Sequence, residues 1–117
     1  DKITVFYGHD YDGMEAYCAG ADGWLSGIPA ILPKQCRAIQ DAVQAGDLEA
    51  ARKAQNNIIP FINYFLYDKK DGVPHWLEIC NYTLTAQGLN VGLPRRPAGD
   101  LDDANKKKIE KLLADMD

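Results

Sequence analysis

Two short apolar runs near the start of the chain, separated by one helical pattern, restrict the folds that these 117 residues can adopt. Residues 3–7 are β-branched and aromatic and stop at Gly8, which is typical of a short strand. From about Tyr11 to Gly20 the apolar spacing is helical, and "GADGWLSG" then supplies a second strand. Two strands joined by one such helix pair in parallel with a right-handed crossover. The first third therefore predicts a β-α-β unit, whose first strand we expect to be buried on both faces.

Helical patterns account for most of the remaining sequence. Pro33 can open one helix, and the side chain of Asp47 can cap the next, "LEAARKAQNNIIPFINYFLY", in which Pro60 should produce a kink rather than an end. A turn at "DKKDG", a helix opened by Pro74, a loop rich in Gly and Pro, and a last helix from Asp102 follow. Two parallel strands followed only by helices leave open strand edges, so we expect the chain to be cut from a longer one at its N-terminal side.

Composition excludes several classes of partner and site. The formal net charge is −4, and nucleic acids and anionic membrane surfaces recruit clustered Lys and Arg, so neither is expected to bind. No stretch has the apolar length of a membrane span and no leader pattern precedes the first strand, so a cytoplasmic location is expected. The three cysteines have neither a metal-ligand spacing nor the pattern of a disulfide framework, and no metal or cofactor is predicted.

Several segments together resemble a known enzyme family. They are "YGHD", "AYCAGADGWLSG", "PKQ", "AVQAGDLEAARKAQNNIIPFINYF" and "GLNVGLPRRP". In this order and spacing they resemble the dihydrodipicolinate synthase and N-acetylneuraminate lyase family, over nearly the entire chain. The resemblance implies an α/β fold, the C-terminal part of a (β/α)8 TIM barrel. Residues 1–46 would hold strands seven and eight with their helices, and residues 47–117 would form a C-terminal helical domain.

The resemblance also implies a chemistry for the parent protein. Family members are class I aldolases and lyases, in which a lysine on strand six forms a Schiff base with a 2-oxo acid such as pyruvate, and a tyrosine from an earlier strand moves protons. That lysine is expected upstream of Asp1, so this chain would carry no catalytic residue and would be inactive by itself. The implied partners are a small 2-oxo acid, the N-terminal remainder of the barrel, and further copies in a homo-oligomer, which is often a tetramer in the family.

The tips of the two strands are where the resemblance places the substrate. Barrel enzymes build their sites from the loops that follow the carboxyl ends of the strands. Glycines there let a ligand approach the backbone, and a carboxylate such as that of Asp10 can accept hydrogen bonds from hydroxyl or amino groups. The expected substrate-binding residues are Gly8, Asp10, Tyr11, Leu25, Ser26 and Gly27.

The same residues also allow simpler interpretations. Asp10 could contact a ligand or cap the helix that follows it, and Asp12 is expected to be a helix cap. His9 is expected to shape the loop rather than to transfer protons, although its ordinary pKa would allow that. Trp24 is expected to pack between the barrel and its helices.

Two other functions stay open at this stage. The same imine chemistry drives dehydratases and deaminases that act on 2-oxo sugar acids or hydroxyproline breakdown products, and the residues that choose the leaving group lie outside this chain. A non-catalytic assembly module is the other alternative, in which the exposed strand edges bind the missing half or a second copy.

Overall fold

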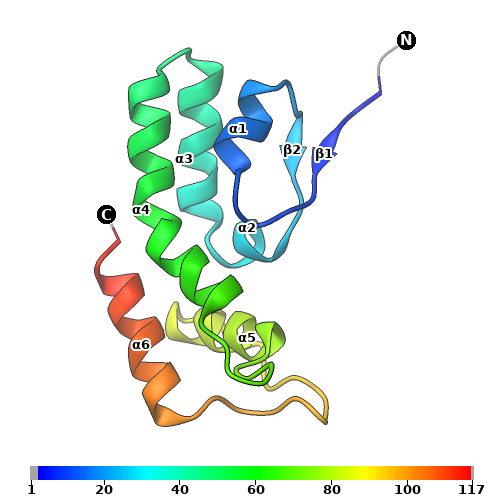
Figure 1. Ribbon diagram of the computed structural model, residues 1–117, viewed down its shortest axis with the longest axis vertical. Coiled ribbons are helices and arrows are strands. Elements are labelled where there is room, and N and C mark those ends of the chain that lie inside the picture. The colour runs from blue at the N-terminus through cyan, green and yellow to red at the C-terminus, as the bar shows by residue number, and fades with distance from the viewer. Residues whose placement is uncertain (1–2, 117) are drawn as a thin grey trace. The chain divides into compact units, whose positions relative to one another are not determined.

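The computed structural model describes residues 3–116, which contain two strands and six helices (Figure 1). The chain divides into two compact units, with the division between residues 62 and 63. The expected boundary between barrel units and helical domain, at residues 46 and 47, concerns membership of a barrel and stays a prediction. No helix within the described residues is long and apolar enough to cross a membrane.

The first unit begins with the expected β-α-β arrangement. It consists of β1 (Phe6–Tyr7), α1 (Gly13–Cys18) and β2 (Gly23–Trp24), and the two strands pair in parallel, with Phe6 opposite Gly23 (Figure 1). A Cβ atom added at Gly23 would lie only 2.6 Å from the Phe6 ring. The strands are shorter than expected because each has a single neighbour within the described residues, so few ladder bonds extend them.

The expectation that the first strand is buried on both faces is wrong for this structure. The relative exposure of Ile3 is 86%, that of Val5 is 53% and that of Phe6 is 61%. One neighbouring strand and one layer of helices cannot cover both faces of β1, and residues 3–116 contain no further strand of this sheet. The strand therefore presents an apolar, partly unpaired surface.

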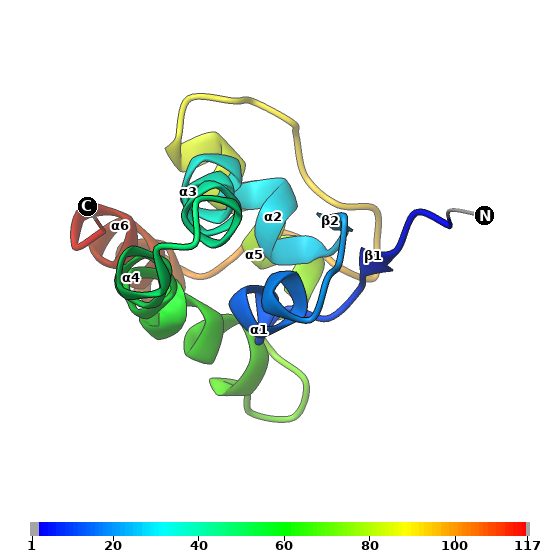
Figure 2. The ribbon, with the colours of Figure 1, turned by 90° about the horizontal axis from the view of Figure 1, so that it is seen from above.

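Helices complete the first unit and enclose its core. They are α2 (Gly27–Ile31), α3 (Pro33–Gln44) and the start of α4 (Leu48–Tyr67), and both α1 and α2 pack on α3 (Figure 2). As predicted, Pro33 opens α3, the Asp47 carboxylate accepts a bond of 2.9 Å from the Ala50 amide, and α4 continues through Pro60. The buried apolar side chains are Trp24, Ile28, Ile31, Leu32, Cys36, Ile39, Ala51, Ile58, Phe61 and Ile62.

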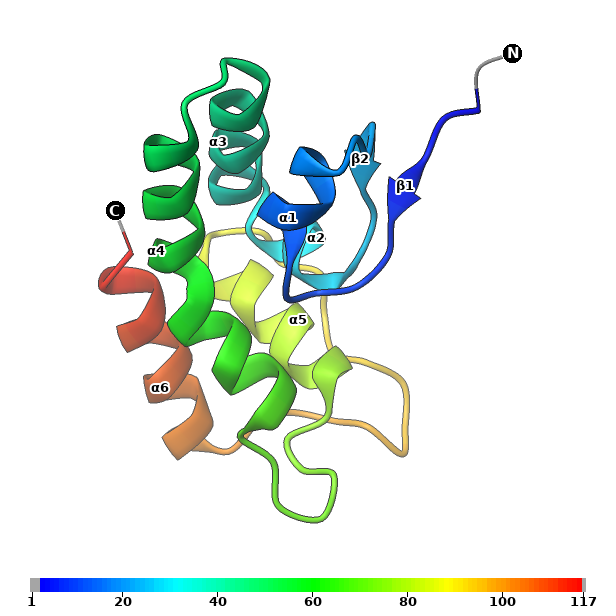
Figure 3. The ribbon, with the colours of Figure 1, turned by 45° about the horizontal axis from the view of Figure 1, so that its top comes forward.

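The second unit contains the end of α4, α5 (Trp76–Ala86) and α6 (Asp103–Ala114), with α5 packed on α6 (Figure 3). The predicted turn is present, because Asp71 and Gly72 both have positive φ and the backbones of Lys70 and Val73 exchange two hydrogen bonds. The last helix begins next to Asp102 as expected, and the Asp102 side chain caps it by accepting a bond from the Asn105 amide. The core side chains of this unit are Tyr64, Phe65, Ile79, Thr83, Leu101 and Ile109.

Candidate functional site

The carboxyl ends of β1 and β2 lie beside each other because the strands are parallel (Figure 3). The Leu25 amide donates a bond of 2.9 Å to the Tyr7 carbonyl, so the pairing continues one residue beyond β2. All six expected substrate-binding residues lie in the loops that leave these two strand ends or at the first turn of α2. The parallel pairing thus brings together residues that are 14 or more positions apart in the sequence.

Asp10 connects the two strand ends. Its Oδ1 atom accepts a bond of 2.8 Å from the Ile28 amide, in the first turn of α2, and a second bond from the Ser26 hydroxyl. Asp10 is therefore a helix cap, but of α2 rather than of the helix that follows it in the sequence. This outcome requires β2 to end next to Asp10, which the local sequence around Asp10 does not encode.

The expectation that Asp12 caps α1 is wrong, because its side chain makes no capping bond. The Met14 amide in the first turn is instead bonded to Oε1 of Gln55 at 2.9 Å, and Nε2 of Gln55 donates to Glu15 at 2.8 Å. Gln55 comes from α4 and is only 6% exposed. The side-chain amide of Gln55, from a helix distant in the sequence, therefore caps the first turn of α1 in place of Asp12.

Trp24 and His9 are hydrogen-bonded to each other near the carboxyl ends of the two strands. The Trp24 indole is 8% exposed, its Nε1 atom donates to the His9 carbonyl at 2.6 Å, and its ring lies against Gly13. The expected packing of Trp24 against a helix is present, whereas its place in a barrel stays a prediction. Nδ1 of the exposed His9 ring accepts a bond of 3.3 Å from the Tyr11 amide, as expected of a residue that shapes the loop.

Gly8 and Leu25 are open to solvent at these strand ends. A Cβ atom added at Gly8 would meet no other atom within 4 Å, and the Leu25 side chain is 75% exposed. Ser26 and Asp10 are half-buried. This arrangement can present one hydroxyl and one carboxylate to a polar ligand, next to backbone that a ligand can approach closely. Among the described residues, no three potential metal-ligating side chains cluster.

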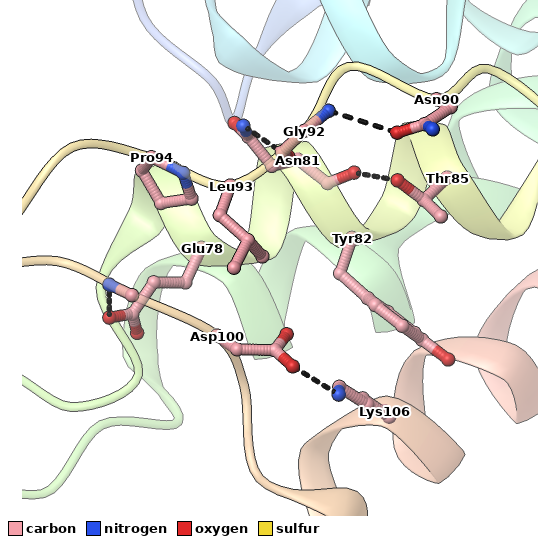
Figure 4. Close-up of a pocket in the computed structure, with 11 residues that line it drawn as sticks. Glu78, Asn81, Tyr82, Thr85, Asn90, Gly92, Leu93, Pro94, Asp100 and Lys106 are labelled. Carbon is pink, nitrogen blue, oxygen red and sulfur yellow. Dashed lines mark hydrogen bonds and ion pairs between the residues drawn. The ribbon is translucent and has the colours of Figure 1, made fainter.

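A second candidate lies in the second unit, in a groove of about 250 Å³ between α5, the following loop and α6 (Figure 4). Its polar groups largely pair with one another. Lys106 forms an ion pair with Asp100 at 2.6 Å, and Asn81 donates to the Gly92 carbonyl at 3.0 Å. Tyr82 donates to Glu110 at 2.6 Å, and this bond raises the pKa of Tyr82 to about 12. These bonds hold the loop against the helices.

Comparisons with known proteins relate the whole described chain to enzymes. A model of the dihydrodipicolinate synthetase family matches residues 1–116. A 4-hydroxy-tetrahydrodipicolinate synthase from Pediococcus pentosaceus is 35% identical over 114 residues, which are 97% of this chain and 36% of the relative.

Two solved structures share the fold of the chain. A dihydrodipicolinate synthase from Agrobacterium tumefaciens has a TM-score of 0.81 at 24% identity, over 100% of this chain and 37% of that one. A sialic acid aldolase from Ruminococcus gnavus has a TM-score of 0.79 at 22% identity, over 96% of this chain and 37% of that one. The chain therefore spans little more than a third of the length of the proteins that it resembles.

Proposed function

Because the chain belongs to the dihydrodipicolinate synthetase family, we propose that it is the C-terminal part of a carbon–carbon lyase or aldolase that acts on a 2-oxo acid through a Schiff base. The match of the family model along residues 1–116 carries the proposal. In it, β1 and β2 are strands seven and eight of a (β/α)8 barrel that ends with residue 46, and residues 47–117 form the helical domain.

The exposed surface of β1 supports the barrel part of the proposal. Phe6 of β1, and Ile3 and Val5 just before it, are exposed apolar side chains, and β1 pairs with one neighbouring strand within residues 3–116. Such a strand exposes unpaired backbone groups and attracts another strand. In the proposed parent, strand six pairs with this edge and the rest of the barrel covers these side chains.

The chemistry of the parent centres on a lysine upstream of Asp1. Its amine condenses with the 2-oxo group and releases water, and the protonated imine then withdraws electrons from the adjacent carbon. A bond to that carbon can break or form through the enamine. The present chain holds and selects the substrate in this scheme. The proposed contacts are Gly8, Asp10, Tyr11, Leu25, Ser26 and Gly27.

The activities named for the similar proteins favour a lyase over a dehydratase, a deaminase or an assembly module. The proteins described above are synthases and an aldolase, so the dehydratase, deaminase and assembly-module hypotheses gain no support from them. We also propose that the full-length protein is a homo-oligomer, a tetramer by resemblance to the family. Light scattering of the full-length protein measures its molar mass and so the number of chains in the oligomer.

Reductive trapping tests the proposed mechanism. The full-length protein is incubated with pyruvate and sodium borohydride, and intact mass spectrometry is expected to find one reduced pyruvate adduct per chain. Peptide mapping should place the adduct on a lysine upstream of Asp1. Substitution of Lys34 by Arg is the control and should leave trapping unchanged, because Lys34 is an exposed side chain at the start of α3. No adduct, or an adduct on a lysine of this chain, would refute the mechanism.

A further inference from the structure

Another pocket of the second unit lies between the turn before α5, the start of α5 and the loop that leads to α6. Its volume is about 470 Å³, which is in the range of small-molecule sites. None of the residues that line it is among the proposed substrate contacts. Neither the resemblance to the family nor the proposed function therefore gives this pocket a role.

Two neighbouring arginines bring positive charge to the pocket. Arg95 and Arg96 both line it, both are exposed, and neither forms an ion pair within residues 3–116. Glu78 lines it too, but its two carboxylate oxygens accept bonds of 3.0 Å from the backbone amides of His75 and Gly99 (Figure 4). Glu78 thus holds the loop to the start of α5, and the two guanidinium groups have no anionic partner among the described residues.

The donors of the lining suit a carboxylate or a phosphate group. A guanidinium group presents several N–H donors in a planar fork, has no acceptor, and can bind either anion through two parallel bonds. Nδ1 of His75 accepts a bond of 3.2 Å from the Leu77 amide, which leaves the ring proton on Nε2 as a further donor. The pocket therefore offers charge and donors to an anion.

Apolar side chains lie beside the arginines. Those that line the pocket are Val73, Leu77, Pro97 and Ala98, and the relative exposure of Val73 is 62%. An inorganic ion would leave this apolar surface in water, whereas a ligand with a hydrocarbon body would cover it and gain from its burial. The lining therefore matches an organic anion better than a free inorganic one.

We propose that this pocket binds a small organic anion, a carboxylate or phosphate group on a short apolar body. Arg95 and Arg96 hold the anionic group, and Val73 and Pro97 cover the body. All of these residues belong to the second unit, so the site is formed without any residue of the strand tips. The inference goes beyond the proposed function and does not depend on a Schiff base.

Chemical modification of arginine tests the inference in the full-length protein. Phenylglyoxal reacts with exposed guanidinium groups, and peptide mapping by mass spectrometry gives the rate at each arginine. Saturating isocaproate or isoamyl phosphate should slow modification of Arg95 and Arg96 about tenfold, as expected of a nearly filled site. Arg52 is the control in the same sample and should react at an unchanged rate, because it is exposed and forms no ion pair within residues 3–116.

Two further probes separate the charge of the ligand from its body. Inorganic phosphate has the charge alone and isoamyl alcohol the body alone, so at the same concentration neither should protect the arginines as well as the organic anions do. Equal protection by either probe overturns the inference, and so does the absence of protection by both organic anions. Arg95 and Arg96 must also react in the unliganded protein. If they do not, another part of the parent covers the pocket and the inference fails.

Substitution of the arginines provides a second measurement. The double variant Arg95→Gln with Arg96→Gln should weaken binding of isocaproate, measured by calorimetry, at least about tenfold, because charge-assisted hydrogen bonds are lost. Arg52→Gln removes a positive charge elsewhere and should leave the affinity unchanged. Equal affinities of the double variant and the unmodified protein contradict the inference. The two proposals fail separately, because isocaproate has no 2-oxo group and the borohydride experiment reports only on the lysine upstream of Asp1.

Discussion

The contact between Gly13 and Trp24 gives a sharp test of the packing at the strand tips. In a Gly13→Ala variant the new Cβ atom would lie 2.3, 2.5 and 2.6 Å from three atoms of the indole ring. Carbon atoms in contact are normally about 3.5–4.0 Å apart, so the ring must move by more than about 1 Å. Trp24 is 8% exposed and its Nε1 atom is bonded to the His9 carbonyl at 2.6 Å, so movement strains the core and lengthens that bond.

The expected loss of stability follows from these contacts. Overpacking costs about 1–3 kcal/mol, and weakening the indole hydrogen bond adds about 1 kcal/mol. Alanine is favoured over glycine in a helix by at most about 1 kcal/mol, which offsets part of the loss. We therefore expect Gly13→Ala to lower the free energy of unfolding by about 2 kcal/mol.

Urea unfolding followed by circular dichroism measures this difference as a shift of the midpoint at an unchanged slope. The matched control is Gly8→Ala, whose Cβ atom would meet nothing within 4 Å, and its midpoint should stay close to that of the unmodified protein. Combining Gly13→Ala with Trp24→Leu should cost less than the sum of the two single changes, because the clash is then relieved. Equal midpoints for the two glycine variants would refute the reasoning.

Further predictions concern caps and titration. Gln55→Ala should lower the unfolding free energy by about 2 kcal/mol, because it leaves a part-buried amide of α1 without its acceptor, and should speed hydrogen exchange of the Met14 amide. Asp47→Ala should cost about 1 kcal/mol in urea unfolding, because the cap of α4 is lost. The raised pKa of Tyr82, about 12 against an ordinary 10.0, predicts stability that is complete below pH 10 and is lost as the pH rises to about 12. Spectrophotometric titration should show the pKa of Tyr82 falling in a Glu110→Gln variant.

Local signals in the sequence predicted two helix starts and one turn correctly, whereas α5 begins at Trp76 with His75 as its cap and not at Pro74 as expected. Pro33 and Asp47 mark the starts of α3 and α4 through effects that act within one helical turn. The turn at Asp71 and Gly72 follows from the few residue types that adopt positive φ. Each of these features depends on neighbours in the sequence, so the sequence alone was sufficient.

Features that depend on distant neighbours were predicted less well. Asp12 has the residue type and position of a helix cap, yet Gln55 reaches the first turn of α1 instead. The location of the candidate site followed from the resemblance to the family together with the parallel strands, but the bonds from Ser26 and Ile28 to Asp10 did not, because they depend on how two loops meet. The β-branched residues before Gly8 indicate a buried strand, and in the proposed parent the covering elements come from residues upstream of Asp1.

The bond between Gln55 and the first turn of α1 has a consequence for the order of events during protein synthesis. The partner of the Met14 amide lies 41 positions further along the chain, and α1 has only six residues. Helices this short are unstable alone in water. We therefore expect α1 to stay unformed on the ribosome until the first half of α4 has left the exit tunnel, although α1 is made much earlier. A chain truncated at residue 46 would keep the whole β-α-β segment and still lack Gln55, the acceptor for the first turn of its helix.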